Sequence, residues 1–241
     1  MRTQFSKFAF TAALVLAITF TFSCSGGDND GGGDPNNGGT SSPSSGAAGN
    51  NKCTDAASCK QKQIGNRVWM AENLNINVAG SECYEKKDAN CDKYGRLYTW
   101  AAAMGIDAKY NEPSWGESDA RHKGICPNGW HIPSNDDWEE LENYVESSNG
   151  CSGCAARYLK STSEWYNNGN GNDKYGFSAL PGGFGLSVGY FYNVGNGGYW
   201  WSASEYDSLI AYHRGMGYYD DYVYYNNYYK ARLLSVRCVQ D

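Results

Sequence analysis

The amino-acid sequence predicts an α+β domain with mainly antiparallel strands and two or three short helices. Two observations describe this domain, and the first of them predicts its fold class. The helical patterns lie between residues 97 and 160, whereas from Phe177 onwards the chain reads as strands separated by glycine- and asparagine-rich turns. In addition, eight of the nine cysteines follow residue 52, and an even set of cysteines in an exported domain indicates a disulfide framework.

Three short segments in the first part of this domain have clear local signals. The apolar and aromatic runs at Arg67–Met70 and Gly129–Ile132 are typical of short strands. A helix is expected over Leu97–Met104, because its apolar residues recur at the spacing that places them on one helical face.

The clearest helix signal follows Ser134 and covers Asn135 to about Ser147. The Ser134 hydroxyl can accept a hydrogen bond from the backbone N–H of Asp137, which is the pattern of a helix N-cap. A three-to-four-residue spacing places four apolar and aromatic side chains on the face expected to be buried: Trp138, Leu141, Tyr144 and Val145. A third short helix is expected over Ala155–Lys160.

The remainder of the chain is expected to form strands, because short runs rich in aromatic and β-branched residues alternate there with turn residues. The expected strands are Phe177–Leu180, Gly189–Val194, Tyr199–Ser204, Ala211–Gly215, Tyr222–Asn226 and Leu233–Val239.

Residues 1–23 have the pattern of a secretory signal peptide. Arg2 and Lys7 precede an apolar run, Phe8–Phe22, which is shorter than the roughly twenty residues needed to span a bilayer. Because the run is followed by Cys24, it resembles a bacterial lipoprotein signal, which is cut before a cysteine that carries lipid. A retained membrane anchor and a plain signal with a free thiol at Cys24 are the alternatives.

Residues 24–52 are expected to be a disordered linker, since they are rich in glycine, asparagine and serine and have few apolar side chains. As a flexible coil, such a linker spans roughly 30 Å. It would hold the domain at residues 53–241 away from the membrane to which lipid on Cys24 attaches the chain. The expected location is the outer membrane or cell surface.

The charge of the chain excludes one class of partner. Loss of the signal peptide leaves 18 Lys and Arg against 26 Asp and Glu, a net charge near −8. Nucleic acid is therefore not expected to bind, because its binding depends on cationic neutralisation of phosphates. The three histidines show no close ligand spacing, so neither a metal nor a cofactor is predicted.

Three pairs of cysteines lie close together in the sequence, and their pairing leaves one long bridge. The expected bridges are Cys53–Cys59, Cys83–Cys91, Cys151–Cys154 and Cys126–Cys238. Eight cysteines allow 105 connectivities, so the spacing favours this set among many. Cys151 and Cys154 also form a Cys-X-X-Cys sequence of the kind found in redox sites, although no thioredoxin-like βαβ pattern surrounds it.

Seven motifs occur in order along the chain: Ile64–Leu74, Tyr94–Trp100, Cys126–Ser134, Asp137–Leu141, Tyr175–Gly183, Trp201–Glu205 and Ser235–Val239. Together they resemble the Fibrobacter succinogenes major paralogous domain over residues 63–240. The resemblance implies a C-type-lectin-like fold, distantly similar to formylglycine-generating enzymes, and implies little about activity. Four tryptophans of these motifs are expected to be core residues: Trp69, Trp100, Trp130 and Trp138.

Two activities associated with such folds lack their sequence signals here. Calcium-dependent lectins use a Glu-Pro-Asn type loop and a Trp-Asn-Asp strand, whereas the nearest string in this chain begins at Glu112 and comes too early. Asp220 and Asp221 alone supply too few oxygens for calcium. A formylglycine-generating oxidase needs a reactive cysteine pair, and the expected disulfides leave no thiol over.

Tyrosines are concentrated near the C-terminus: ten of the twenty lie in residues 199–230. Doublets such as Tyr218-Tyr219 and Tyr224-Tyr225 place neighbouring rings on opposite faces of a strand, so some rings are expected to be exposed. Tyrosine mixed with serine, glycine, asparagine and aspartate is also typical of antibody paratopes. The alternative is that aromatic residues simply favour strands.

The sequence therefore predicts a non-catalytic binding or adhesion lipoprotein that recognises an extracellular polysaccharide or protein. The expected ligand-binding residues are Tyr206, Tyr212, His213, Arg214, Tyr218, Tyr219, Asp220, Tyr222, Tyr224, Tyr225 and Tyr228. The alternatives are an enzyme on a formylglycine-generating-enzyme-like fold and a structural envelope protein.

Overall fold

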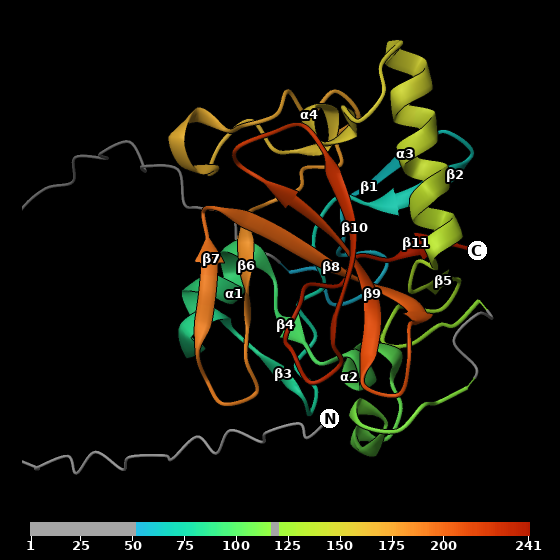
Figure 1. Ribbon diagram of the computed structural model, residues 1–241, viewed down its shortest axis with the longest axis vertical. Helices are drawn as coiled ribbons and strands as arrows, with labels where there is room; N and C mark the ends of the chain where they lie inside the picture. The colour runs from blue at the N-terminus through green and yellow to red at the C-terminus, as the bar shows by residue number, and fades with distance from the viewer. Residues whose placement is uncertain (1–51, 117–120) are drawn as a thin grey trace, which may run out of the picture. The chain divides into compact units, whose positions relative to one another are not determined.

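The computed structural model describes residues 52–116 and 121–241, which combine α-helices with mainly antiparallel sheets (Figure 1). The α+β class predicted from the sequence is therefore confirmed. The predicted signal peptide at residues 1–23, Cys24 and all of the predicted linker except Lys52 lie outside the described residues. Within the described ranges, no helix is long and apolar enough to cross a membrane.

The α-helices of the described residues all precede residue 160, and the longer strands follow it. The first part contains β1 (Gln61–Ile64), β2 (Arg67–Met70), β3 (Ser81–Glu82), α1 (Asp88–Tyr94), β4 (Leu97–Tyr98), α2 (Trp100–Met104), β5 (Trp130–His131), α3 (Asn135–Asn149) and α4 (Ala155–Leu159). The second part contains β6 (Gly182–Gly185), β7 (Phe191–Val194), β8 (Gly197–Glu205), β9 (Ile210–Gly217), β10 (Val223–Tyr229) and β11 (Val239–Gln240).

These strands form three sheets, with the orders β1-β2-β11-β5, β10-β9-β8-β6-β7 and β3-β4. The strand pairings are antiparallel except that between β6 and β8. Val239 of β11 lies opposite both Trp69 and His131, so the last strand is inserted between two strands of the first part. In the five-stranded sheet, β10 is an edge strand.

Helix α3 and its N-cap are confirmed. Ser134 Oγ accepts a hydrogen bond from the backbone N–H of Asp137 at 3.2 Å, and the Asp137 carboxylate accepts one from the backbone N–H of Ser134 at 2.9 Å. These two bonds make a capping box. The helix ends at Asn149, because Gly150 takes a left-handed conformation with φ of 63°.

Other expected elements are confirmed with small shifts of their ends. Strand β2 has the expected bounds, β5 is one residue shorter than expected at each end, and α4 is one residue shorter at its C-terminal end. The four strands expected between residues 189 and 226 are present as β7, β8, β9 and β10, and the last three are longer than expected. The sequence patterns did not indicate β1, β3, α1 or β6.

The helix expected over Leu97–Met104 is wrong in its first part. Leu97 and Tyr98 form β4, and only residues from Trp100 onwards are helical. The change occurs at Thr99, whose hydroxyl accepts a hydrogen bond from the backbone N–H of Ala102 at 3.3 Å and so caps α2. The whole segment is largely buried, so its apolar periodicity did not separate a strand from a helix.

Two expected strands are also wrong or reduced. In Phe177–Leu180, the Ala179 carbonyl accepts hydrogen bonds from the Ser161 backbone at 2.9 Å and the Trp165 indole at 3.1 Å, so no strand ladder forms. In Leu233–Val239, the first three residues make isolated bridges to three different segments, and only Val239 belongs to a strand, β11. These segments connect sheets rather than extend one.

Two large hydrophobic clusters and a small third one stabilise the domain, and tryptophans are prominent in the two large clusters. The four tryptophans expected in the core are each at most 4% exposed, which confirms that prediction. Trp200 and Trp201 are consecutive on β8 and therefore point to opposite faces of the sheet. One lies in each large cluster, so β8 runs between the two halves of the core.

Four disulfides join the cysteines in the pairs expected from their spacing: Cys53–Cys59, Cys83–Cys91, Cys126–Cys238 and Cys151–Cys154. The Cys126–Cys238 bridge connects residues 112 apart and holds the end of the chain against the segment before β5. In the chain-entropy model, a loop of this length corresponds to about 4–5 kcal/mol of stabilisation.

Candidate functional site

The tyrosine-rich segment forms a hairpin of β9 and β10, joined by the turn at residues 218–222. Residues directly opposite each other in an antiparallel pair share a face. Tyr224 pairs with Gly215 and lies on one face, whereas Tyr225 pairs with Arg214 and lies on the other. The hairpin therefore divides the tyrosine doublet of β10 between two surfaces, and the predicted ligand-binding residues divide in the same way.

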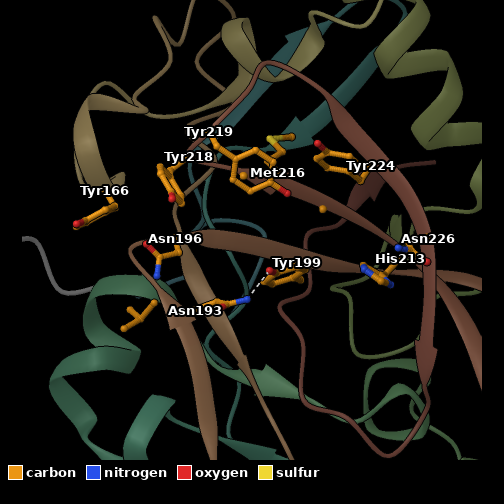
Figure 2. A pocket seen from close by; sticks show the side chains of 13 residues that line it. Tyr166, Asn193, Asn196, Tyr199, His213, Met216, Tyr218, Tyr219, Tyr224 and Asn226 are labelled. Atoms are coloured by element: carbon orange, nitrogen blue, oxygen red, sulfur yellow. Dashed lines mark hydrogen bonds between the residues drawn. The ribbon is translucent and has the colours of Figure 1, made fainter.

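A cavity of about 770 Å³ lies on the face that carries Gly215 and Tyr224 (Figure 2). We call it the tyrosine-lined pocket. Its tyrosines are Tyr166, Tyr199, Tyr218, Tyr219 and Tyr224, and its asparagines are Asn193, Asn196 and Asn226. They come from β7, the β7–β8 turn, β8, β10, the turn after β9 and the short 3-10 helix Tyr166–Asn168. Among the described residues that line the pocket, none is Asp, Glu, Lys or Arg.

Glycines make room for this pocket. Gly215 and Gly217 of β9 belong to its lining and contribute backbone alone. A Cβ atom on Gly217 would lie 2.7 Å from Cε1 of Tyr219, and one on Gly197 would lie 2.6 Å from the Tyr199 hydroxyl oxygen. Real Cβ atoms do not approach that closely, so glycine at these positions allows both rings to lie against the strands.

Hydrogen bonds and ring contacts fix the tyrosines of the pocket. Asn193 Nδ2 donates to the Tyr199 hydroxyl oxygen at 2.8 Å, as the dashed line in Figure 2 shows. The Tyr224 hydroxyl donates to the Asp220 carboxylate, and this bond raises the pKa of Tyr224. Tyr218 contacts the rings of Tyr166 and Tyr219 edge-to-face, with centroids 5.3 Å and 5.4 Å apart. The rings are thus held in place before any ligand binds.

His213 contributes a neutral wall to the pocket. Its side chain is 4% exposed, and its ring stacks on Tyr228 with centroids 5.1 Å apart. Burial, and secondarily the charge of Arg214, lower the pKa of His213 to about 4. The imidazole is therefore uncharged at neutral pH. Its Nδ1 atom has no hydrogen-bond partner among the described residues.

The opposite face of the hairpin carries a second group of aromatic residues. Tyr212 stacks on Tyr225 with centroids 4.8 Å apart, and Tyr206 contacts Tyr212 edge-to-face at 5.4 Å. We call these three residues the stacked-tyrosine surface. Tyr206 and Tyr225 are 56% and 51% exposed, and neither lines the tyrosine-lined pocket.

Arg214 is a correction to the predicted site. Its side chain is only 1% exposed, and its guanidinium lies 4.4 Å from the ring centroid of Tyr225. Nε donates to the Glu142 carboxylate at 2.6 Å and Nη1 donates to the side-chain carbonyl of Asn135 at 3.2 Å. Arg214 therefore attaches β9 to helix α3 and cannot contact a ligand directly.

The turn between β9 and β10 is held by α4 and by Lys160, the residue that follows this helix. Lys160 Nζ donates to the carbonyl oxygens of Gly217 at 3.0 Å and Asp220 at 2.8 Å, while burial lowers the pKa of this lysine. Asp221 accepts through its backbone carbonyl from Ala156 N at 2.9 Å. These bonds position Tyr218 and Tyr219 at the rim of the tyrosine-lined pocket.

Tyr222 does not line the pocket and packs against the loop of the Cys151–Cys154 disulfide. A Cβ atom on Gly153 would lie 2.2 Å from Cε1 of Tyr222, so the ring rests directly on that glycine. The disulfide loop, α4 and the tyrosine turn thus form one unit. Tyr222 stays 54% exposed, and its role in this unit is to support the turn.

Sequence reasoning missed several residues of the site. Tyr166, Asn193 and Asn196 line the pocket although they precede the tyrosine-rich segment, and Lys160 supports its turn. The asparagines of the 3-10 helix and of the β7–β8 turn were the only sequence feature that could have indicated that these segments belong to the site. Within the described ranges, no group of three or more His, Cys, Asp or Glu side chains is arranged to hold a metal ion.

Comparison with known families decides where the chain belongs. The model of the Fibrobacter succinogenes major domain matches residues 63–240. The chain belongs to the Fibrobacter succinogenes major domain family. This match includes every described residue that lines the tyrosine-lined pocket, so the pocket is part of the Fibrobacter succinogenes major domain itself. The family name states no function. No curated protein matches the chain, and no solved structure does.

Proposed function

We propose that this Fibrobacter succinogenes major domain is a non-catalytic binding module that holds an extracellular polysaccharide in the tyrosine-lined pocket. One observation carries the proposal: the described lining combines five tyrosines and three asparagines with a backbone floor and has no Asp, Glu, Lys or Arg. Such a lining is matched to a neutral ligand with many hydroxyl groups and apolar C–H faces.

The chemistry of the lining supports a sugar. Tyrosine rings offer flat apolar faces together with one hydroxyl each, and the C–H faces of a sugar ring can stack on them. Each asparagine amide supplies two donors and one acceptor, which match the hydroxyl groups of a sugar. The cavity of about 770 Å³ lies within the range of 300–1,000 Å³ typical of ligand sites.

The rigidity of the pocket supports binding as well. Tyr199 is held by Asn193, and Tyr224 is held by Asp220, so these side chains lose little freedom when a ligand arrives. Preorganisation of this kind raises affinity by lowering the entropy cost of binding. A protein ligand is the other partner expected from the composition, but a concave pocket of this size favours a slender polysaccharide over a broad protein surface.

An enzyme on a formylglycine-generating-enzyme-like fold is the main alternative. Its chemistry would need a reactive cysteine pair, whereas the eight cysteines of the described residues are joined in four disulfides. Thiol titration of the unfolded, unreduced protein distinguishes a binding module from an oxidase. Eight blocked cysteines support the binding module, and a free pair would favour the oxidase.

The proposal includes the fold and the location of the domain. A C-type-lectin-like fold is supported by the family resemblance, by the mainly antiparallel sheets and by the small number of helices. Anchoring by lipid on Cys24 at the outer membrane or cell surface is supported by the signal-like pattern of residues 1–23. Mass spectrometry of the membrane-extracted protein tests the anchor, since a chain that begins before Cys24 would contradict it.

The binding proposal is tested with a glycan array and with depletion on insoluble polysaccharides. Tyr219→Ala and Tyr224→Ala remove rings from the tyrosine-lined pocket. Tyr206→Ala is the matched control, because it removes a ring of similar exposure from the opposite face, 56% against 66% for Tyr219. We expect the pocket variants to lose at least about tenfold in affinity, or about 1.4 kcal/mol, and the control to keep it. Equal retention of all three variants would overturn the pocket assignment.

A further inference from the structure

His213 combines deep burial with unused hydrogen-bonding capacity at the wall of the tyrosine-lined pocket. The residue is 4% exposed, and its Nδ1 atom has no hydrogen-bond partner among the described residues. Nε2 has no partner there either, but unlike Nδ1 it is not sealed from solvent. Buried polar atoms nearly always have a partner in folded proteins, so an imidazole of this kind in a pocket lining indicates a partner that a ligand supplies.

The burial of Nδ1 determines which nitrogen of His213 carries the proton. A neutral imidazole has one N–H donor and one acceptor nitrogen, and burial keeps this ring neutral by lowering its pKa to about 4. A buried N–H without an acceptor is rarer in folded proteins than a buried acceptor without a donor. The proton therefore belongs on Nε2, where the N–H can reach a ligand in the pocket.

Two further donors lie on the strands to either side of His213 (Figure 2). Asn226 of β10 is directly opposite His213, and the Tyr199 ring of β8 has its centroid 6.0 Å from that of His213. The Tyr199 hydroxyl accepts from Asn193, so its own proton remains for donation, and burial keeps it protonated by raising its pKa. The side-chain oxygen of Asn226 accepts from the backbone N–H of Asn227 at 2.8 Å, so its NH₂ group remains for a ligand.

The chemical group that fits three neighbouring donors accepts hydrogen bonds and has no proton of its own to donate. A sugar hydroxyl brings a proton that needs an acceptor, and the described lining has no carboxylate to take it. A ligand carboxylate would accept as well, but the described lining has no Lys or Arg to compensate its charge. The neutral carbonyl oxygen of an amide meets both conditions.

We propose that the tyrosine-lined pocket recognises the acetamido group of an N-acetylhexosamine residue, whose carbonyl oxygen accepts a hydrogen bond from Nε2–H of His213. The inference rests on the proposed function, because this residue belongs to the polysaccharide that the pocket holds. Tyr199 and Asn226 supply the neighbouring donors, and the side-chain oxygen of Asn193 is available for the acetamido N–H. Gly215, two residues from His213 on the same face of β9, has no side chain and leaves room for the methyl group.

Calorimetry with pairs of sugars that differ only in the C2 substituent tests the proposal. The pairs are chitopentaose with cellopentaose, and N-acetylglucosamine, N-acetylgalactosamine and N-acetylmannosamine, each with its parent hexose. We expect the protein to bind at least one N-acetylated member about tenfold more tightly than its partner. Equal affinities within every pair, or a glycan array that shows binding only to glycans without N-acetylated residues, would overturn the proposal.

Variants of His213 separate the N–H donor from the ring that carries it. His213→Phe keeps a ring that can stack on Tyr228 but has no N–H, so it should bind the two members of a pair equally. The change removes a buried nitrogen that has no partner among the described residues, so the fold should be retained, as urea denaturation checks. His213→Gln places an amide nitrogen as many bonds from Cβ as Nε2 and should keep most of the preference, and Tyr206→Ala, on the opposite face, should keep all of it.

Two outcomes would contradict the role of His213 directly. The N-acetyl preference would survive in His213→Phe, or nitrogen NMR of the wild-type imidazole would show the proton on Nδ1 instead of Nε2. In the expected case, the Nε2–H signal shifts when chitopentaose is added and does not shift with cellopentaose at the same concentration.

Tyr224→Ala separates this proposal from the function on which it rests. The change removes a ring of the pocket and leaves the three donors in place, so it should weaken both members of each pair equally. If it does so while no pair shows an N-acetyl preference, the pocket binds sugar and only the acetamido assignment fails. If no pair binds and the glycan array shows no binding, both proposals fail.

Discussion

Arg237 donates a hydrogen bond from Nη2 to the side-chain oxygen of Asn73 at 2.8 Å, joining residues 164 positions apart. The same Asn73 oxygen accepts from the Trp200 indole at 2.8 Å. Arg237 is fully buried and has carbonyl oxygens, including that of Phe177, in place of a carboxylate. One asparagine therefore links the first strands, the central β8 and the last segment of the domain.

Replacement of Asn73 by alanine is expected to destabilise the domain strongly. The change leaves a buried guanidinium and a buried indole without their acceptor, which costs about 2–4 kcal/mol of unfolding free energy. Urea denaturation followed by tryptophan fluorescence measures the loss. Asn143→Ala, at an exposed position of α3, is the control and should change stability by less than about 0.5 kcal/mol. Similar losses in both variants would show that the asparagine does not organise the core.

Lys160→Met is expected to weaken ligand binding more than it weakens the fold. The lysine holds the turn carbonyls of Gly217 and Asp220, and these position the pocket tyrosines. Methionine fills much the same volume but donates no hydrogen bond, so the turn should become mobile and affinity should fall about tenfold, or about 1.4 kcal/mol. Binding assays are compared with Lys123→Met, at an exposed lysine outside the site. Full affinity in Lys160→Met would contradict the role given to this lysine.

The Cys151–Cys154 disulfide is expected to act on the site rather than on global stability. Its loop carries Gly153, on which Tyr222 rests. The double change to serine should reduce affinity several-fold while changing the unfolding free energy less than removal of Cys126–Cys238, whose long loop contributes about 4–5 kcal/mol. Removal of Cys53–Cys59, another short bridge, serves as the control. If affinity is equally reduced by the control, the local argument is wrong.

The sequence predicted those features that local chemistry determines. Helix α3 was predicted because Ser134 and Asp137 form its cap from neighbouring positions. The exposure of several tyrosines followed from the alternation of a strand, and four of the predicted tyrosines are more than half exposed: Tyr206, Tyr219, Tyr222 and Tyr225. Both inferences need no knowledge of distant segments.

The rest of the site depends on contacts between distant segments. Arg214 looked available because it stands among tyrosines, but the approach of α3 buries it against Glu142 and Asn135. Tyr166 and Asn193 belong to the pocket only because the 3-10 helix and β7, neither of which pairs with β9 or β10, also line it. No local sequence pattern shows which distant segments will lie next to each other. The sequence therefore identified the hairpin as part of the site and missed the side of the pocket that Tyr166 and Asn193 form.

Acidification is expected to destabilise the domain through His213. The folded state holds the pKa of His213 at about 4, whereas the unfolded chain has the ordinary value of 6.5. Between these values the unfolded state binds a proton that the folded state does not, so stability is fully present above pH 6.5 and falls as the pH drops towards 4. The loss is at most about 3 kcal/mol. Urea denaturation at pH 4.5, 5.5 and 7 should show that the unfolding free energy falls more steeply with decreasing pH in the wild type than in His213→Gln. The variant lacks the titrating imidazole but keeps every carboxylate, so it serves as the control for the pH dependence that the carboxylates cause. Parallel curves for the two proteins would mean that folding does not lower the pKa of His213, which would contradict the burial of its ring as the cause of the shift.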